Sequence, residues 1–258
     1  MTAPLSASNL YLSYGKTEVL KDISLDLPKG KITSIVGANA SGKSSLLRCL
    51  ARVLTPTKGG VSLEGVSITE QRSRDVARKV ALLSQTSEAP DAMRVMDLVI
   101  RGRTPHQSAL RQWSQKDQEI VEWCCEQVGL SSQQNSLLGE LSGGQRQRAW
   151  IAMVLAQDTD ILLLDEPTTF LDLPHQIEIL NLIQKLQKER GLTVAMVLHD
   201  INLATRYSDH IVAVKDGGIL LQGAPEGVVT ADNMQAIFGL DSTILPDPVT
   251  GLPHVIAR

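Results

Sequence analysis

The chain has 258 residues, of which 43% are apolar and 21% charged, and its formal net charge is −3. These values are ordinary for a globular protein and exclude the strong basic field that draws proteins to nucleic acid. The longest apolar runs, such as residues 161–164, are far too short to cross a bilayer, and the first fifteen residues lack the regions of a signal peptide. We therefore expect a cytoplasmic protein.

Short strands joined by tight turns are predicted in the first third of the chain. Alternating apolar and polar residues at 23–27 favour a half-exposed antiparallel strand, whereas residues 31–36 are typical of a buried strand. Helical spacing follows at residues 44–54, and residues 59–68 indicate a hairpin that turns at Glu64 and Gly65. This part of the sequence predicts an antiparallel β region next to a buried strand that leads into a helix.

The pattern becomes helical from about residue 88 to residue 157, with candidate helices at 93–102, 116–130 and 145–157. We interpret this stretch as a helical subdomain inserted into the fold.

Strands and helices alternate after this stretch. Strands are predicted at residues 161–165, 193–199 and 210–223, and an amphipathic helix at 181–191 ends at Gly191. Such alternation implies a mostly parallel α/β core. Residues 241–258, with three prolines, are expected to form an ordered but irregular tail.

A phosphate-binding loop is predicted at residues 37–44. They read GANASGKS and match the pattern G-x-x-x-x-G-K-[ST] in full, between a buried strand and a helix. The backbone N–H groups would surround phosphate oxygens, Lys43 would reach the β- and γ-phosphates, and the Ser44 hydroxyl would bind Mg²⁺. The candidate nucleotide-binding residues of this loop are Gly37, Ala38, Asn39, Ala40, Ser41, Gly42, Lys43, Ser44 and Ser45.

Polar residues at two strand ends supply candidates for hydrolysis. Asp165 and Glu166 end a buried strand, so one carboxylate can serve Mg²⁺ while the other acts as general base on the attacking water. We assign Asp165 to the metal and Glu166 to the base. His199 ends the next apolar strand and could donate to a γ-phosphate oxygen or hold the attacking water.

Two further residues are candidates for the same site. Gln85 follows the segment VALLS and can supply an amide ligand to Mg²⁺ or to water. Tyr14 precedes Gly15 in an early hairpin and could stack on an adenine ring, although a core aromatic is the alternative there. Tyr11 is the competing aromatic, further from the turn.

A second anion site is predicted at LSGGQ, residues 141–145. Ser142 is a strong N-cap residue, and the two glycines allow a ligand to approach the backbone at the start of a helix. The bare N–H groups and the positive end of the helix dipole favour an anion. The candidate residues here are Ser142, Gly143, Gly144 and Gln145.

Taken in order, these motifs resemble the ATP-binding cassette (ABC) ATPases over essentially the whole chain. LSGGQ between a P-loop and a strand ending in Asp-Glu is highly specific for that family. The resemblance implies a P-loop NTPase fold with a RecA-like α/β core, an antiparallel β subdomain and a helical subdomain, forming one ATP-binding domain over residues 1–258. It also implies ATP and Mg²⁺ as the nucleotide and the metal.

A narrower resemblance points to one branch of the family. Residues 101–107 (RGRTPHQ), 141–157 and 164–180 are similar to the ATPase subunits of bacterial ferric-siderophore importers. Heme and cobalamin importers are near neighbours and remain alternatives. A soluble cassette protein, such as a ribosome-associated ATPase, is disfavoured because the chain has one cassette and no heptad repeat.

The resemblance also implies partners. Two copies would meet head to tail around two ATP molecules, with Ser142, Gly143 and Gly144 of one copy at the γ-phosphate bound by the other. Residues 169–172, ending at Asp172, would be the D-loop at that interface. A groove beside Gln85 would receive a coupling helix from a separate membrane permease, which a substrate-binding protein serves, and no nucleic acid is expected. The cassette would then lie on the cytoplasmic side of the inner membrane.

Some positions depart from the family pattern. Ala38 and Ala40 stand where relatives often have proline and glycine, and Ser45 stands where threonine is usual. None of these changes removes a fixed position of the loop, so we expect only local stiffening. Phe170 occupies a D-loop position where a small residue is common, which leaves its packing open.

Overall fold

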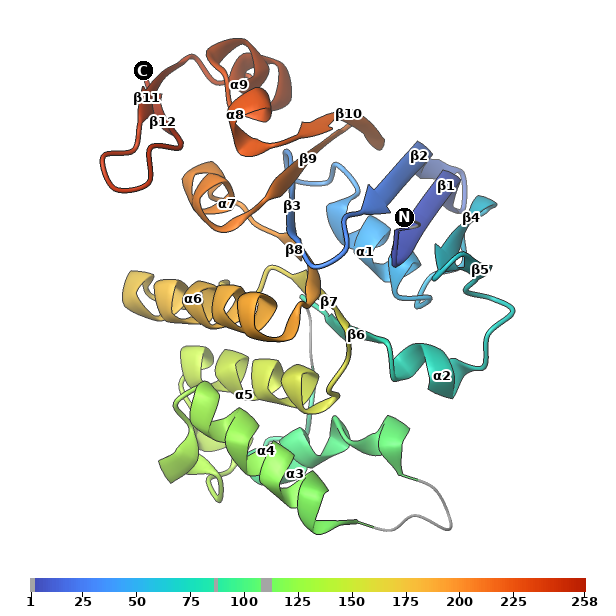
Figure 1. Ribbon diagram of the computed structural model, residues 1–258, viewed down its shortest axis with the longest axis vertical. Coiled ribbons are helices and arrows are strands. Elements are labelled where there is room, and N and C mark those ends of the chain that lie inside the picture. Colours follow the sequence, from blue (N-terminus) through green and yellow to red (C-terminus); the bar gives the residue numbers. More distant parts are fainter. Residues whose placement is uncertain (1–2, 86–87, 108–112) are drawn as a thin grey trace.

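A mixed β-sheet forms the centre of the molecule. The computed structural model describes residues 3–85, 88–107 and 113–258. Parts of the predicted domain (1–258) and of the predicted helical subdomain (88–157) therefore lie outside the described residues. Over the described ranges the main sheet has six strands in the order β10-β9-β3-β8-β7-β6 (Figure 1). They are β3 (Ile32–Val36), β6 (Val80–Leu83), β7 (Ile161–Asp165), β8 (Thr193–Val197), β9 (His210–Lys215) and β10 (Gly218–Gly223).

The strands of the main sheet run parallel except for the edge strand β10. The residues of β3, β7 and β8 are buried on both faces, which explains their nearly continuous apolar sequences. Parallel strands end at the same edge of a sheet, so the residues that follow β3, β7 and β8 are brought together there.

A second, antiparallel sheet lies beside the main one. In the described part of the chain its order is β2-β1-β4-β5. The strands are β1 (Leu5–Tyr14), β2 (Thr17–Leu27), β4 (Lys58–Leu63) and β5 (Val66–Ser67). Glu64 and Gly65 both have positive φ in the tight turn between β4 and β5, which confirms the hairpin turn predicted there. Helix α1 (Lys43–Leu50) packs between the two sheets through Leu46 and Leu47.

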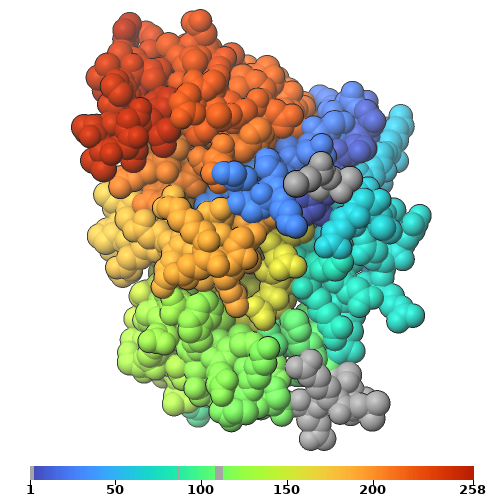
Figure 2. Space-filling view, viewed as in Figure 1, coloured from blue at the N-terminus to red at the C-terminus, as the bar shows by residue number. Residues whose placement is uncertain are grey.

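Helices cover the remaining faces. They are α2 (Ser73–Ala77), α3 (Val95–Arg101), α4 (Gln115–Gln127), α5 (Gly143–Ala156), α6 (Leu173–Arg190), α7 (Ile201–Tyr207), α8 (Pro225–Val228) and α9 (Ala231–Phe238). Helices α3, α4 and α5 pack on one another and form a layer at one end of the molecule, which we call the helical layer. Figures 1 and 2 show this layer in green, at the end opposite the C-terminal elements.

Arg103 links helices within the helical layer, and Gln157, the residue after α5, joins that layer to the sheet. The buried guanidinium of Arg103 pairs with Asp117 at 2.9 Å and donates to the Ala156 carbonyl at 2.8 Å. The side chain of Gln157 donates to the carbonyls of Ala77 and Val80, at 2.6 and 3.0 Å. Hydrogen bonds therefore connect the C-terminal end of α5 directly to α2 and to strand β6 of the main sheet.

The C-terminal segment differs from the expectation of an irregular tail. It forms an antiparallel pair, β11 (Ser242–Pro246) and β12 (Pro253–Ala257). The Asn202 side chain in α7 makes two hydrogen bonds to the backbone of Val255. It accepts from the Val255 N–H at 2.7 Å and donates to the Val255 carbonyl at 3.1 Å. Two of the prolines stand at the strand ends, where a missing N–H costs the ladder little, so they did not prevent pairing.

Helix boundaries also differ from the prediction. The helix expected at 181–191 starts at Leu173, because a proline fits the first helical turn and does not interrupt the helix there. It ends at Gly191, in the left-handed conformation, as predicted. Helices α2, α7, α8 and α9 were not predicted.

Candidate functional site

Two glycines fix the shape of the P-loop between β3 and α1. A Cβ on Gly37, at φ +147°, would lie 2.1 Å from the Val214 carbonyl oxygen. A Cβ on Gly42, at φ +102°, would lie 2.9 Å from the Val19 carbonyl oxygen. No side chain fits at either position, which explains why the pattern requires glycine at both ends of the loop.

The loop opens into a cavity of about 670 Å³, a volume in the range of small-molecule sites. Most of the residues predicted for the nucleotide and its hydrolysis meet here. The lining consists of Val19, Asn39, Ala40, Ser41, Gly42, Lys43, Ser44, Ser45, Gln85, Glu166 and His199. Gly37 and Ala38 lie behind it, where their carbonyls accept hydrogen bonds from the Lys43 ammonium at 2.9 and 2.7 Å.

Lys43 is held as a buried cation. Its side chain reaches back over its own loop, and the residue is only 5% exposed. Burial lowers the pKa of the Lys43 ammonium, and the Glu166 and Asp165 carboxylates oppose that effect. A cation in this position is aimed at the centre of the loop, where phosphate oxygens would lie.

Asp165 fits the predicted role of a metal ligand. The Ser44 hydroxyl donates to Asp165 Oδ1 at 2.9 Å, and the residue is 1% exposed. Asp165 Oδ2 is buried and has no hydrogen-bond partner among the described residues. Burial raises the pKa of the Asp165 carboxyl, with Glu166 adding to the effect and the Ser44 hydrogen bond opposing it. An unpartnered carboxylate oxygen next to a hydroxyl is a suitable pair of ligands for Mg²⁺.

Protein ligands alone would not complete that coordination. Nowhere in ranges 3–85, 88–107 and 113–258 do three or more His, Cys, Asp or Glu side chains converge as a metal site. Mg²⁺ commonly uses one or two protein ligands together with substrate phosphates and water. The arrangement therefore suits a nucleotide-bound cation better than a structural one.

Glu166 and His199 form a direct pair across the ends of β7 and β8. His199 Nε2 lies 2.7 Å from Glu166 Oε1. The Thr169 hydroxyl donates to the other oxygen, Oε2, at 3.0 Å. Asp200 caps α7 by accepting from the N–H groups of Asn202 and Leu203, which fixes the turn that follows His199. The predicted base and the predicted histidine are thus in contact.

Tyr14, the residue predicted to stack on adenine, does not line the cavity. It ends β1 and is 49% exposed, while Val19, from the following strand, lines the cavity instead. Nothing in the sequence around Val19 distinguishes it from other strand residues, so sequence reasoning missed it. The stacking of Tyr14 on adenine remains a prediction.

The signature residues begin α5, away from the P-loop. Ser142 Oγ accepts from the Gln145 N–H at 3.2 Å, and Gln145 Oε1 accepts from the Ser142 N–H at 3.0 Å. This reciprocal capping box orders the helix start, and none of the residues 142–145 lines the P-loop cavity. Within one chain, the two predicted anion sites remain separate.

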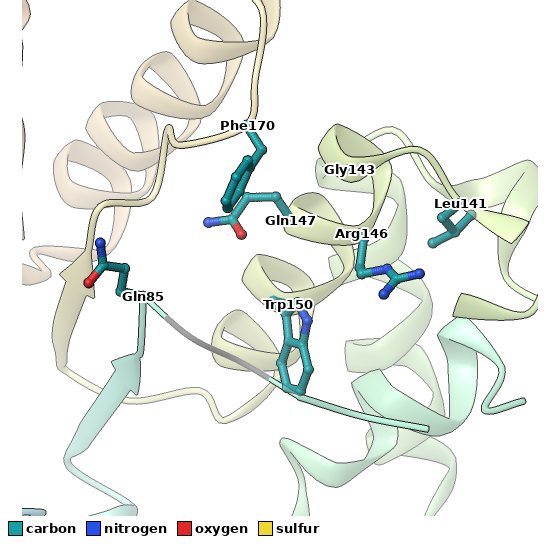
Figure 3. Close-up of a pocket in the computed structure, with 7 residues that line it drawn as sticks. All are labelled: Gln85, Leu141, Gly143, Arg146, Gln147, Trp150 and Phe170. Atoms are coloured by element: carbon teal, nitrogen blue, oxygen red, sulfur yellow. The ribbon is translucent and has the colours of Figure 1, made fainter. Parts of the chain in front are cut away.

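A second cavity of about 370 Å³ lies beside the signature helix (Figure 3). Trp150 and Gln147 project from α5, Phe170 reaches in from the loop after β7, and Gln85 lies across from them. Phe170 is 77% exposed, and it sits at φ +66°. Among the described residues that line them, Gln85 is common to both cavities.

Asp172, the last residue of the predicted D-loop, is bonded to His175 in the first turn of α6. This hydrogen bond holds the pKa of the Asp172 carboxyl below its usual value. Asp172 does not line the P-loop cavity, so a contact with nucleotide on the same chain is not part of this geometry.

Across the three described ranges, no helix is long and apolar enough to span a bilayer.

Comparisons with known proteins agree with this site. A family model described as ABC transporter matches residues 20–169. The ferric enterobactin transport ATP-binding protein of Escherichia coli is 46% identical over 254 residues, which is 98% of this chain and 94% of that protein. The petrobactin import ATP-binding protein FpuD of Bacillus anthracis is 47% identical over 256 residues, 99% of this chain and 94% of that protein.

Solved structures give the same result. A dimeric ATP-binding cassette in a post-hydrolysis state, bound to ADP and Pi, superposes with a TM-score of 0.77 at 26% identity, covering 85% of this chain and 98% of that chain. The fold is that of an ABC ATPase, with the core, antiparallel sheet and helices expected from the motifs. The chain belongs to the ABC transporter family, as one of its ATP-hydrolysing cassettes.

Proposed function

We propose that this chain is the ATP-hydrolysing subunit of an importer that takes up a ferric siderophore or a related iron complex. The observation that carries this proposal is an identity of 46–47% over nearly the whole chain with two subunits, one of ferric enterobactin transport and one of petrobactin import. The intact hydrolytic site supports it, because an importer subunit of this kind must cleave ATP.

ATP binding begins at the P-loop. Its backbone N–H groups and the start of α1 surround the phosphates, and Lys43 exchanges its two carbonyl partners for phosphate oxygens. Tyr14 stacks on the adenine from the neighbouring hairpin.

The metal ligands in this proposal are Ser44 and Asp165, with Gln85 approaching from the end of β6. Bound Mg²⁺ would neutralise charge on the β- and γ-phosphates. The unpartnered Asp165 Oδ2 supports the assignment, because a buried carboxylate oxygen without a partner is costly unless something binds it.

Glu166 accepts the proton of the attacking water, and His199 holds the Glu166 carboxylate on one side and faces the phosphate cavity on the other. A positioned general base typically contributes about 10²–10⁴ in rate. The remainder of the barrier is lowered by charge stabilisation from Lys43 and the loop amides.

A second copy of the chain completes each site. The structural neighbour bound to ADP and Pi is itself dimeric, and here the signature residues lie apart from the P-loop of their own chain. In the proposed head-to-tail dimer, Ser142, Gly143 and Gly144 contact the γ-phosphate held by the other copy. Residues 169–172 line the interface between the copies.

The proposed membrane partner is a separate permease, and it docks at the second cavity. That cavity combines two aromatic side chains, Trp150 and Phe170, with Gln85, which also lines the nucleotide cavity. A coupling helix bound there would contact a residue of the ATP site directly. A substrate-binding protein delivers the iron complex to the permease, and the cassette lies on the cytoplasmic face of the inner membrane.

Growth of a deletion strain tests the proposal. We expect growth to fail on individual ferric siderophores and to be restored by the wild-type gene, with a freely available iron salt as the control. Normal growth on every ferric siderophore, with a defect on heme or on cobalamin, would assign the cassette to one of those importers. Co-purification with ribosomes in place of a membrane protein would indicate a soluble cassette.

A further inference from the structure

A short turn brings the side chain of Thr169 back onto the proposed base. The Thr169 N–H donates to the Glu166 carbonyl at 3.2 Å, which closes a four-residue turn with Pro167 at its second position. Proline favours that position because its φ is already suitable. The same turn places the Thr169 hydroxyl 3.0 Å from Glu166 Oε2.

The Glu166 carboxylate is consequently held at both oxygens. His199 contacts Oε1 and Thr169 donates to Oε2. A carboxylate has about four acceptor positions, so two contacts fix its orientation and still leave positions for a water proton. With the His199 contact alone, the Glu166 carboxylate could rotate about its Cγ–Cδ bond and turn away from the attacking water.

The loop that carries Thr169 is itself fixed at its far end. The Gln176 side chain donates to the Leu171 carbonyl at 2.9 Å, and His175 bonds to Asp172. Leu171 also packs on the signature helix, where a Cβ on Gly144 would lie 3.1 Å from its side chain. The orientation of Glu166 is thereby linked to the shape of a loop that touches both α5 and α6.

We propose that Thr169 is a positioning residue for Glu166, and that its hydroxyl holds the Glu166 carboxylate in the orientation needed to accept a proton from the attacking water. This role rests on the proposed function, in which Glu166 is the base. Thr169 does not line the nucleotide cavity, so its effect is on the rate constant of cleavage and not on nucleotide affinity.

Variants at two neighbouring threonines test the proposal in steady-state ATP hydrolysis with the permease present. Thr169→Val keeps the shape and removes the hydroxyl, and Thr169→Ser keeps the hydroxyl. Thr168→Val is the matched control, because the Thr168 hydroxyl makes no hydrogen bond to any residue in ranges 3–85, 88–107 and 113–258. We expect Thr169→Val to lower kcat by about 10-fold, since small misplacements of a reacting group are costly, with KM within about twofold of wild type.

The two other variants show whether a loss of kcat in Thr169→Val comes from the missing hydroxyl. Thr169→Ser should restore kcat to near the wild-type value, and Thr168→Val should leave it unchanged. A thermal unfolding midpoint is measured for each protein to show that all are folded. If Thr169 had only a structural role, Thr169→Val would lower that midpoint and would change kcat and KM together.

Three results would overturn the role of Thr169: a wild-type kcat for Thr169→Val, a Thr169→Ser variant as slow as Thr169→Val, or an equal loss in Thr168→Val. Wild-type hydrolysis is measured first. Its absence would contradict the proposed function, whereas a wild-type rate that Thr169→Val leaves unchanged would contradict only the positioning role.

Discussion

Two glycine-containing turns lead into helices in this molecule, at α1 and at α5, and they are built differently. Around the start of α1, Lys43, Asp165, Glu166 and His199 gather from three separate segments, and the lysine and aspartate are almost fully buried. At the start of α5, Ser142 and Gln145 satisfy each other's backbone N–H groups, and both Ser142 and Gly143 are exposed.

The difference indicates separate tasks. The α1 turn has the charges and the carboxylates needed to bind a phosphate chain and cleave it. The α5 turn has only backbone dipoles and a hydroxyl, which can stabilise an anion that something else has already bound. Four predictions, from the largest expected effect to the smallest, test that division.

The largest effect is expected for Glu166→Gln. The amide cannot accept the proton of the attacking water, so hydrolysis should fall by about 10²–10⁴-fold. ATP should still bind, and a closed dimer should accumulate, which size-exclusion chromatography with ATP would detect. A variant that hydrolyses ATP at the wild-type rate would show that Glu166 is not the base.

Ser142→Arg tests the α5 turn alone. A long cation at the N-cap should block the approach of a phosphate held by another chain, and hydrolysis should fall by roughly 10²-fold, as for loss of a transition-state donor. Binding of a fluorescent ATP analogue should be unchanged, whereas Lys43→Ala should lose it. If Ser142→Arg abolishes binding as well, the two turns do not have separate tasks.

Alanine at matched glycines compares the two turns directly. At Gly42 the new Cβ would meet the Val19 carbonyl at 2.9 Å with φ at +102°, so Gly42→Ala should distort the loop and lose ATP binding. At Gly144 it would lie 3.1 Å from the end of the flexible Leu171 side chain, so Gly144→Ala should fold and bind ATP normally. If calorimetric titration showed that Gly42→Ala and Gly144→Ala lose ATP affinity equally, the distinction between the two turns would be contradicted.

The smallest effect is on stability, from Asp165→Asn. Burial raises the pKa of Asp165, so its ionised form is unfavourable in the folded protein. Removing the charge should stabilise the nucleotide-free protein by about 1 kcal/mol, which raises Tm by about 3 °C in a chain of this size.

The pH dependence gives the control for Asp165→Asn. As the pH falls through the raised pKa, wild-type Asp165 becomes protonated and the difference in Tm should disappear. The measurement is differential scanning calorimetry in EDTA. A Tm for Asp165→Asn below that of the wild type at neutral pH would show that the ionised carboxylate is favourable.

The sequence predicted those parts of the site that depend on local rules. The P-loop, the Asp165–Glu166 pair and His199 each follow a strand of the main sheet, and parallel strands bring their ends together. The Thr169–Glu166 contact, the contribution of Val19 and the exposure of Phe170 were not predictable, because each depends on how a loop packs against a distant element.

The fold shows the same division. The end of α6 at Gly191 and the hairpin turn at Glu64 and Gly65 are predictable from local conformational preferences. The β11–β12 pair is not evident from the local sequence because its three prolines disfavour strands, and the hydrogen bonds from Asn202 that hold Val255 come from another part of the chain.

The bonds from Gln157 to Ala77 and Val80 have a mechanical consequence. Helix α5 has 14 residues and is about 21 Å long. If the helical layer rotated about the hydrogen bonds of Gln157, each degree of rotation would move the start of α5 by about 0.4 Å. Trp150 lies near the middle of α5, so in such a rotation Ser142 would move about twice as far as Trp150.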